Sequence, residues 1–319
     1  MDSNVRPAHL GRTSDDTEMR YMDQSNVREP SKQPQKRCSA CSAKSNSKGI
    51  DVSRRDSENR GTCGLKSLPY VYALGGIEAR FSNRSMEMEY HQAAKMSKPV
   101  DLDRRQTFYA VLSLPKNRYL ARKLSWVLTI QGVPTYILLP TGPEDLDGLI
   151  EAIRPQWGPL DRQVVVGRKG PIAQLDMCGL EVPMVLIDQI YQFKHGEFMR
   201  SIQREAAAGE RFRDAADDMS RRMMQIADNT GSTDKHRALN YLSVRCPEIY
   251  TKAAEEMERD FSLTSVEARD SRIRGSRKIV SVVFSFTNKN GTAERYFVRV
   301  DTTEQFPFLV TKMAPFYDR

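Results

Sequence analysis

Alternating apolar residues near the C-terminus constrain the fold of this 319-residue chain more than any other feature. Ile279–Thr287 and Glu294–Val300 alternate apolar and polar residues with a period of two, the pattern of half-buried β-strands. An Asn-Gly pair at positions 290–291 lies between them and favours the tight turn of a β-hairpin. Thr264–Arg269 and Phe308–Lys312 alternate in the same way, so the sequence predicts a C-terminal antiparallel sheet.

Helical periodicity characterises the region that precedes this sheet. Apolar residues recur every three or four positions between 211 and 227, which indicates one amphipathic helix. Thr233 is a suitable cap for a second helix, and Pro247 suits the first turn of a third. A central helical segment is therefore expected before the sheet.

The region from residue 68 to residue 193 mixes β-rich runs with helical stretches. Tyr70–Leu74 alternates as a strand does, and the glycines at 75 and 76 are expected to end that strand before Ile77–Phe81 begins another. Trp126–Ile130 and Thr135–Leu139 flank a turn and predict a hairpin. Shorter elements are expected as helices at 82–96, 103–114, 117–124, 143–153 and 188–193, and as strands at 164–166 and 184–187.

Helices and hairpins occupy separate parts of the sequence, which argues for an α+β fold rather than a doubly wound sheet. The expected architecture consists of antiparallel hairpins, a central helical segment and a C-terminal antiparallel sheet. We expect one ordered domain over residues 67–319, divisible into sub-parts at 67–205 and 206–319. Residues 1–66 hold ten serines, one aromatic residue and no sustained apolar period, so they are expected to form a disordered tail.

Net charge and hydropathy limit the partners of the chain. Of the net charge of +8, the tail contributes 13 Lys/Arg and 9 Asp/Glu, or +4, and the rest is spread thinly over the domain. Such dilute basicity makes nucleic-acid binding an unfavoured function. No apolar run reaches the roughly 18 residues of a membrane helix, and the N-terminus lacks the apolar core of a signal peptide. We therefore expect a cytoplasmic protein that does not associate with membranes.

Five cysteines are an odd number and do not indicate a secreted disulfide framework. Cys38 and Cys41 form a C-x2-C pair, and Cys63 follows in the same tail, which makes zinc a candidate ligand of these three thiolates. A redox or modification target, or no function, are the alternatives for the tail cysteines. Cys178 and Cys246 lie in apolar surroundings and are expected to be reduced, buried thiols.

The sequence offers few groups for catalysis. It lacks the Gly-x-Ser-x-Gly elbow of a serine hydrolase and the glycine spacing of a phosphate-binding loop. Cys178 is a conceivable nucleophile, but its apolar flanks favour an inert thiol. His91 is expected to pair with Glu87 on a helix, and His195 is expected at the surface.

The start of the helix after Thr233 brings together polar groups that suit binding. Asp234 and His236 lie in its first turn, where free N–H groups and the helix dipole favour an anionic partner. Arg237 adds a fork of donors, and Asn240 follows on the same helix. These residues form the candidate binding site. The alternative is structural, in which Asp234 supports the cap and His236 packs on a neighbour.

Motifs spread over both halves of the chain resemble one known family. The first half contributes Tyr70–Gly75, Ile77–Phe81, Asn117–Leu120, Trp126–Ile130, Glu151–Pro155, Gly170–Ala173, Met177-Cys178 and Asp188–Tyr191. The second half contributes Asp228-Asn229, His236–Leu242, Tyr296–Asp301, Phe306–Lys312 and Pro315–Arg319. From Leu68 onward the chain resembles the C-terminal domain of the cyanobactin maturation protease PatG and its relatives. In that family the domain follows a subtilisin-like protease or macrocyclase that processes ribosomally made peptides.

The resemblance implies a pathway but no reaction. The chain has no counterpart of the protease's catalytic Asp, His and Ser, and we expect a free-standing domain without proteolytic or macrocyclising activity. The resemblance implies an accessory protein that binds a precursor peptide, a processing protease or a second copy of itself. The rival hypothesis is an enzyme of unknown reaction, metal-dependent or not, that uses Asp234, His236 and Cys178. A zinc or redox sensor that works through the tail is a third.

Removal of the tail tests the expected domain organisation. A chain that begins at Leu68 should melt within about 2 °C of the full chain, because residues 1–66 carry no periodic apolar pattern. Thermal melts of the two proteins, followed by circular dichroism, measure the difference. A large drop in melting temperature would show that the tail belongs to the fold.

Overall fold

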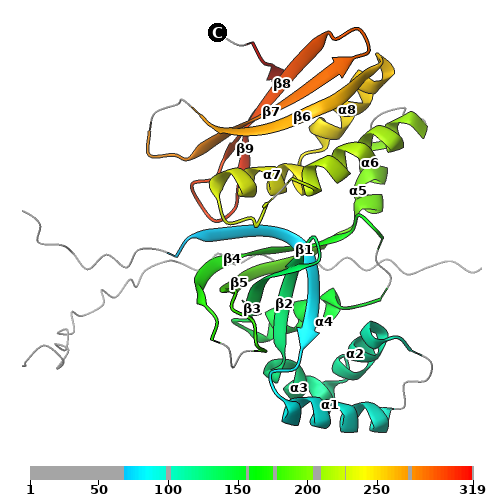
Figure 1. Ribbon diagram of the computed structural model, residues 1–319, viewed down its shortest axis with the longest axis vertical. Helices are drawn as coiled ribbons and strands as arrows, with labels where there is room; N and C mark the ends of the chain where they lie inside the picture. Colours follow the sequence, from blue (N-terminus) through cyan, green and yellow to red (C-terminus); the bar gives the residue numbers. More distant parts are fainter. Residues whose placement is uncertain are drawn as a thin grey trace, which may run out of the picture. The chain divides into compact units, whose positions relative to one another are not determined.

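A computed structural model describes residues 68–97, 102–155, 158–174, 178–203, 210–226, 228–271 and 275–317. They form a small β-barrel with its own helices, a second group of helices, and a separate four-stranded sheet (Figure 1). The expected tail (residues 1–66) and the predicted first residue of the domain, 67, lie outside the described residues, so the predicted domain limits stay a prediction. No helix within the described ranges is both long and apolar enough to cross a bilayer.

The barrel closes with the strand order β1-β2-β3-β5-β4. Its strands are β1 (Tyr70–Arg80), β2 (Ser125–Ile130), β3 (Val133–Leu139), β4 (Arg162–Ile172) and β5 (Pro183–Phe193). Neighbouring strands are antiparallel except β3 and β5, which run parallel. The predicted hairpin of β2 and β3 is confirmed, and its turn residues Gln131 and Gly132 have φ values of 51° and 81°, as a two-residue hairpin turn requires.

Strand β1 changes partner half-way along its length. Tyr70–Gly75 pairs with β4, whereas Gly76–Arg80 pairs with β2. The predicted break at the two glycines is therefore wrong, because they lie inside one continuous strand. A Cβ atom at Gly75 would lie 2.3 Å from the carbonyl oxygen of Thr129, so only glycine allows β2 to approach where the strand changes partner.

Strands β4 and β5 also differ from the sequence prediction. Strand β4 continues through Gly167, where a Cβ atom would lie 2.1 Å from the carbonyl oxygen of Leu186. The helix predicted at 188–193 is instead the second half of β5, in which Tyr191 pairs with Val164. The local pattern of residues 188–193 suits a helix as well as a strand, and pairing with the buried strand β4 decides in favour of the strand.

Helices cover the barrel where the sequence predicts them. They are α1 (Arg84–Ser97), α2 (Arg104–Leu112), the short 3-10 helix η1 (Pro115–Asn117), α3 (Arg118–Lys123) and α4 (Pro143–Ala152). Asn83 caps α1 by accepting a hydrogen bond from the Met86 amide (2.9 Å). Asp103 begins α2 with a reciprocal capping box to Gln106, which fixes the start of that helix.

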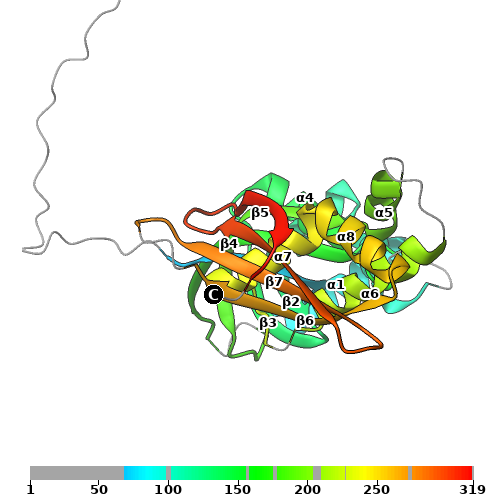
Figure 2. The same cartoon turned by 90° about the horizontal axis from the view of Figure 1, so that it is seen from above.

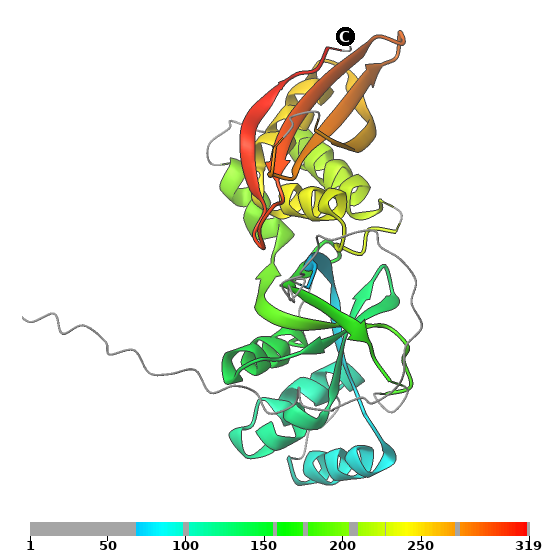
Figure 3. The ribbon, with the colours of Figure 1, turned by 90° about the vertical axis from the view of Figure 1, so that its left-hand side faces the viewer.

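The second group of helices packs against one face of the C-terminal sheet (Figures 2 and 3). The helices are α5 (His195–Gln203), α6 (Glu210–Met224), α7 (Asp234–Arg245) and α8 (Pro247–Glu258). The sheet contains β6 (Phe261–Asp270), β7 (Ile279–Asn288), β8 (Ala293–Asp301) and β9 (Phe308–Pro315), paired in sequence order and all antiparallel. The predicted α+β class, central helical segment and C-terminal antiparallel sheet are thus confirmed.

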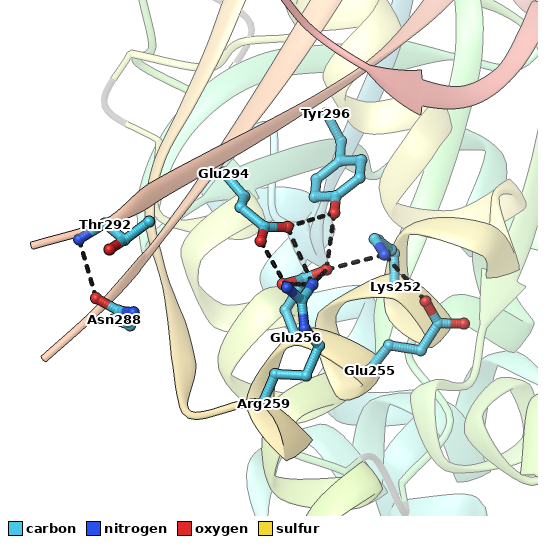
Figure 4. Close-up of polar contacts among 8 residues, drawn as sticks. All are labelled: Lys252, Glu255, Glu256, Arg259, Asn288, Thr292, Glu294 and Tyr296. Atoms are coloured by element: carbon cyan, nitrogen blue, oxygen red, sulfur yellow. Dashed lines mark hydrogen bonds and ion pairs between the residues drawn. The ribbon is translucent and has the colours of Figure 1, made fainter. Parts of the chain in front are cut away.

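A buried carboxylate joins α8 to β8 (Figure 4). Glu256 is fully buried and accepts from Lys252 (2.8 Å), Arg259 (3.1 Å) and the Tyr296 hydroxyl (3.0 Å). Arg259 also donates to Glu294 on β8 (2.6 Å), and the Tyr296 hydroxyl lies 2.7 Å from Glu294, so its single proton is available to one of the two carboxylates at a time. Two cations and one hydroxyl therefore compensate two carboxylates, which is the condition under which a buried charge is tolerated.

Replacement of Glu294 tests this network through its pH dependence. Hydrogen bonds from Arg259 and Tyr296 lower the pKa of Glu294 from its ordinary 4.5 to about 2. A carboxylate with a depressed pKa stabilises the fold above its unfolded pKa, and that contribution is lost as the pH falls through the folded pKa. Glu294→Gln should therefore lower the free energy of unfolding at pH 7, and the difference from wild type should vanish between pH 4.5 and about 2.

Urea titrations of both proteins at several pH values measure this effect. Glu258→Gln, at an exposed position at the end of α8, is the matched control and should cost less than about 0.5 kcal/mol. A difference for Glu294→Gln that stays constant down to pH 2 would show that the carboxylate's charge contributes nothing.

Candidate functional site

The predicted binding residues on α7 lie at the junction with β1 and with the loop before β9. Arg237 is buried, and its guanidinium donates to the backbone carbonyls of Thr302 (2.7 Å), Glu304 and Gln305 (3.0 Å). The Tyr70 ring lies over the same group at 5.3 Å. The fork of donors that the sequence assigns to a ligand is directed at this chain's own carbonyl oxygens.

Asn240 has an equally defined set of partners. Its side-chain amide donates to the Tyr72 carbonyl (2.8 Å) and accepts from Asn229 (2.7 Å). The Tyr72 amide donates to the Gly231 carbonyl (2.9 Å). Tyr72 belongs to the half of β1 that does not pair with β2, so Asn240 and Gly231 satisfy the backbone groups on that open edge.

Asp234 and His236 begin α7 as predicted. Thr233 caps the helix by accepting from the His236 amide (3.1 Å). Asp234 accepts from Arg237 (3.3 Å) and forms an ion pair with Lys278 (3.4 Å). His236 is half-buried, and burial lowers the pKa of its imidazole, whose Nδ1 atom has no hydrogen-bond partner among the described residues. Binding of an anion by these two residues stays a prediction.

Helices α5 and α6 bring together a histidine, a serine and an aspartate. His195 Nε2 lies 2.8 Å from Ser220 Oγ, and His195 Nδ1 lies 3.7 Å from Asp217. The prediction that His195 lies at the surface is wrong, because the residue is buried and its amide donates to Asp161 (2.9 Å). Burial lowers the pKa of His195, while Asp217 and Asp161 act in the opposite direction.

The serine, histidine and aspartate contact one another in the same order as in a hydrolytic triad, but the serine is not accessible to a substrate. Ser220 is 0% exposed and Tyr250 beside it is also 0% exposed, so a substrate cannot reach the serine oxygen in this packing. A triad needs its nucleophile next to space for the scissile carbonyl. We therefore assign His195, Ser220 and Asp217 to the interior hydrogen bonding of the helical layer.

A pocket of about 620 Å³ lies between β1, α2 and the end of α4. Its lining consists of Ile77, Glu78, Ala79, Arg80, Phe81, Arg104, Arg105, Phe108, Ile153 and Cys178. The volume falls in the range of small-ligand and peptide pockets. Among the described residues, three guanidinium groups and one carboxylate line it, so their charge favours an anionic ligand.

The three arginines of this pocket have different surroundings. Arg80 is half-buried and pairs with Glu78 (3.3 Å). Arg104 is exposed and lies 5.9 Å from the centre of the Phe108 ring. Arg105 donates to the carbonyls of Ala152 (3.1 Å) and Ile153 (3.3 Å), and desolvation lowers its pKa while Glu78 acts in the opposite direction.

An aromatic layer supports the pocket. Tyr90 of α1 stacks on Phe108 with ring centres 4.5 Å apart, and Phe81 lies 5.2 Å from Tyr90. Tyr90 is buried, which raises the pKa of its hydroxyl to about 12, while the charge of Arg104 acts in the opposite direction. That hydroxyl has no hydrogen-bond partner within the described ranges.

The two cysteines of the domain differ. Cys246 is buried as predicted, and burial raises the pKa of its thiol to about 11. Cys178 was predicted to be buried but is only half-buried, because it lies in a turn with a φ of 59° and lines the pocket. Asp234 and His236 do not line that pocket, so the enzyme hypothesis receives no support from a shared site.

The residues that the sequence offers as metal ligands, three cysteines of the tail, lie outside the described residues. Within the described ranges no group of three or more His, Cys, Asp or Glu side chains is arranged to hold a metal ion. Cys38, Cys41 and Cys63 all precede residue 68, so a zinc site there stays a prediction.

Arg237→Gln tests the structural role of α7. The change should lower the free energy of unfolding by about 2–4 kcal/mol, because buried carbonyl groups lose a charged donor. The control is Lys235→Gln on the same helix, an exposed residue whose ion pair with Asp270 spans 3.4 Å, with an expected cost below about 0.5 kcal/mol. Equal costs in chemical denaturation would contradict the assignment.

Comparisons with known proteins give one family. A family model described as PatG Domain matches residues 70–268, from the start of β1 into β6. A solved structure titled "PatG Domain of Unknown Function" is similar with a TM-score of 0.64 and 20% sequence identity, and the match covers 78% of this chain and 98% of that one. At this identity the likeness shows the fold alone. A search of curated proteins finds no match. Because the family model spans more than half of the sequence, the chain belongs to the PatG domain family.

Proposed function

We propose that this protein is a non-catalytic binding protein in the maturation of ribosomally made, cyanobactin-like peptides. Membership of the PatG domain family supports the pathway. The pocket beside β1 supports the binding role, because it joins three arginines with an aromatic layer at the side of the barrel. The ligand that suits this lining is a segment of precursor peptide that carries a negative charge.

The chemistry of the pocket favours binding over catalysis. Guanidinium groups stay protonated at physiological pH, so they hold an anion but do not exchange protons with it. Glu78, the one carboxylate among the described residues of the lining, is paired with Arg80. The Cys178 thiol lies in the same lining, but the described residues of that lining include no histidine to act as the general base that ordinarily activates a cysteine nucleophile.

Titration of a synthetic cyanobactin-type precursor peptide into the full chain tests the proposal. Arg104→Gln should weaken binding about tenfold, since it removes one charge-assisted contact from the pocket. Its melting temperature should stay close to that of the wild type, because Arg104 is exposed. Arg200→Gln, an exposed arginine on α5, is the matched control and should bind as the wild type does.

Two results would contradict this function. The first is that no precursor peptide binds at concentrations up to about 1 mM, the weak limit of a specific contact. The second is turnover of the peptide, followed by mass spectrometry, that Cys178→Ser abolishes, since this would make the pocket a catalytic site.

A further inference from the structure

We propose that the peptide binds as an added β-strand on the open edge of Ile77–Phe81, with its free C-terminal carboxylate held by the arginines of the pocket. This inference rests on the proposed function. It adds the docking mode and the chemical group that is recognised.

The lining of the pocket identifies a strand edge rather than a strand face. Ile77, Glu78, Ala79, Arg80 and Phe81 are consecutive, and all five line the same pocket. Successive side chains of a strand point to opposite faces, so a cavity against one face would be lined by alternate residues only. A cavity lined by every residue in turn must lie along the edge, next to the backbone N–H and C=O groups.

The pairing of β1 explains why this edge is open. Gly76–Arg80 pairs with β2 on one side, while pairing with β4 on the other side ends at Gly75. Among the described residues, no backbone hydrogen bond reaches the β4 side of Ile77–Arg80. Backbone groups on an open edge form a template for another extended chain.

The other half of β1 provides an internal comparison. Tyr70–Gly75 lacks β2 on its second edge, and there Gly231 and Asn240 bond the amide and carbonyl of Tyr72 at 2.9 and 2.8 Å. The chain thus covers the open edge of Tyr70–Gly75 with polar groups from Gly231 and Asn240. The open edge of Ile77–Phe81 instead faces the pocket of about 620 Å³, which has room for a short extended segment.

The charges around the open edge favour a carboxylate at the end of that segment. Arg104 and Arg105 come from the first turn of α2, and Arg80 comes from the last position of β1. Beyond Arg80 the chain leaves the sheet and enters α1 at Arg84, so an added strand has little length to continue beside it. A chain terminus fits this geometry better than an acidic side chain in mid-strand, and a guanidinium matches a carboxylate with two parallel hydrogen bonds.

A synthetic hexapeptide tests both parts of the inference. Thr-Val-Thr-Val-Thr-Phe with a free C-terminus is titrated into the full chain by calorimetry, beside its C-terminal amide and an amide that carries one internal aspartate. The amide should bind about tenfold more weakly, and the internal aspartate should not restore affinity. In Arg104→Gln the difference between acid and amide should shrink below about threefold, whereas Arg200→Gln should retain it.

Two N-methylated forms of the hexapeptide test strand addition. Methyl groups on alternate amides remove either the hydrogen bonds to the open edge or those that point away from it. The two forms should therefore differ in affinity by at least about tenfold. Hydrogen exchange of the full chain should slow at the amides of Ile77–Phe81 when the unmethylated hexapeptide is bound.

Several outcomes would overturn the inference. They are no binding of the free-acid hexapeptide, equal binding of acid and amide, recovery by the internal aspartate, or equal binding of the two methylated forms. Protection of Ile77–Phe81 that rises with protein concentration and without peptide would make a second copy of the chain the occupant. None of these results bears on the precursor titration, which decides the proposed function separately.

Discussion

The change of partner along β1 is the constraint on which the rest of the structure depends. A closed barrel of five strands needs strong bending, and β1 supplies it by pairing with β4 up to Gly75 and with β2 from Gly76 onward. The carbonyl of Thr129 approaches so closely at Gly75 that no side chain fits there. Each half of the strand consequently keeps one edge outside the barrel, and both edges must meet something else.

The open edge of Tyr70–Gly75 determines how the barrel packs against the helical layer. Asn240 and Gly231 bond to Tyr72, and Tyr136 of β3 donates to the Thr230 carbonyl at 3.1 Å. The backbone at the start of β1 thereby becomes part of the loop that precedes α7. Arg237 extends the same junction to the carbonyls of Thr302 and Gln305. Buried backbone groups must be satisfied, which explains why α7 carries polar residues on its inward side.

Local signals accounted for most elements of the fold. The caps at Asn83 and Thr233 and the turn at 131–132 are encoded by neighbouring residues. The sequence predicts the Thr233 cap and the hairpin, although the second strand begins at Val133, two residues earlier than expected. Gly75 and Gly167 could not be interpreted locally, because each is needed where a strand distant in sequence approaches closely. The same holds for 188–193, whose strand conformation depends on β4.

The pocket was harder to predict from the sequence than the fold. Arg104 and Arg105 form an ordinary basic pair at the start of a helix, and no periodicity connects them with Ile77–Phe81. Arg237 and Asn240 were found because a fork of donors near a helix start suits an anion, yet their partners are internal carbonyls. Residue type shows what a side chain can bind, whereas the topology decides whether a ligand or the chain itself is the partner.

An open strand edge is an aggregation hazard, and the charges on this one bear on its selectivity. Natural proteins protect such edges with charged side chains, and Glu78 and Arg80 occupy that position here as a pair 3.3 Å apart. An uncharged strand that docks here would exclude water from Glu78 and Arg80 and would offer neither side chain a charged partner in return. A strand that ends in a carboxylate gives Arg80 and its neighbours a second anion, which offsets the cost of excluding water from the guanidinium groups. The same two side chains can therefore discourage indiscriminate pairing and favour a peptide terminus.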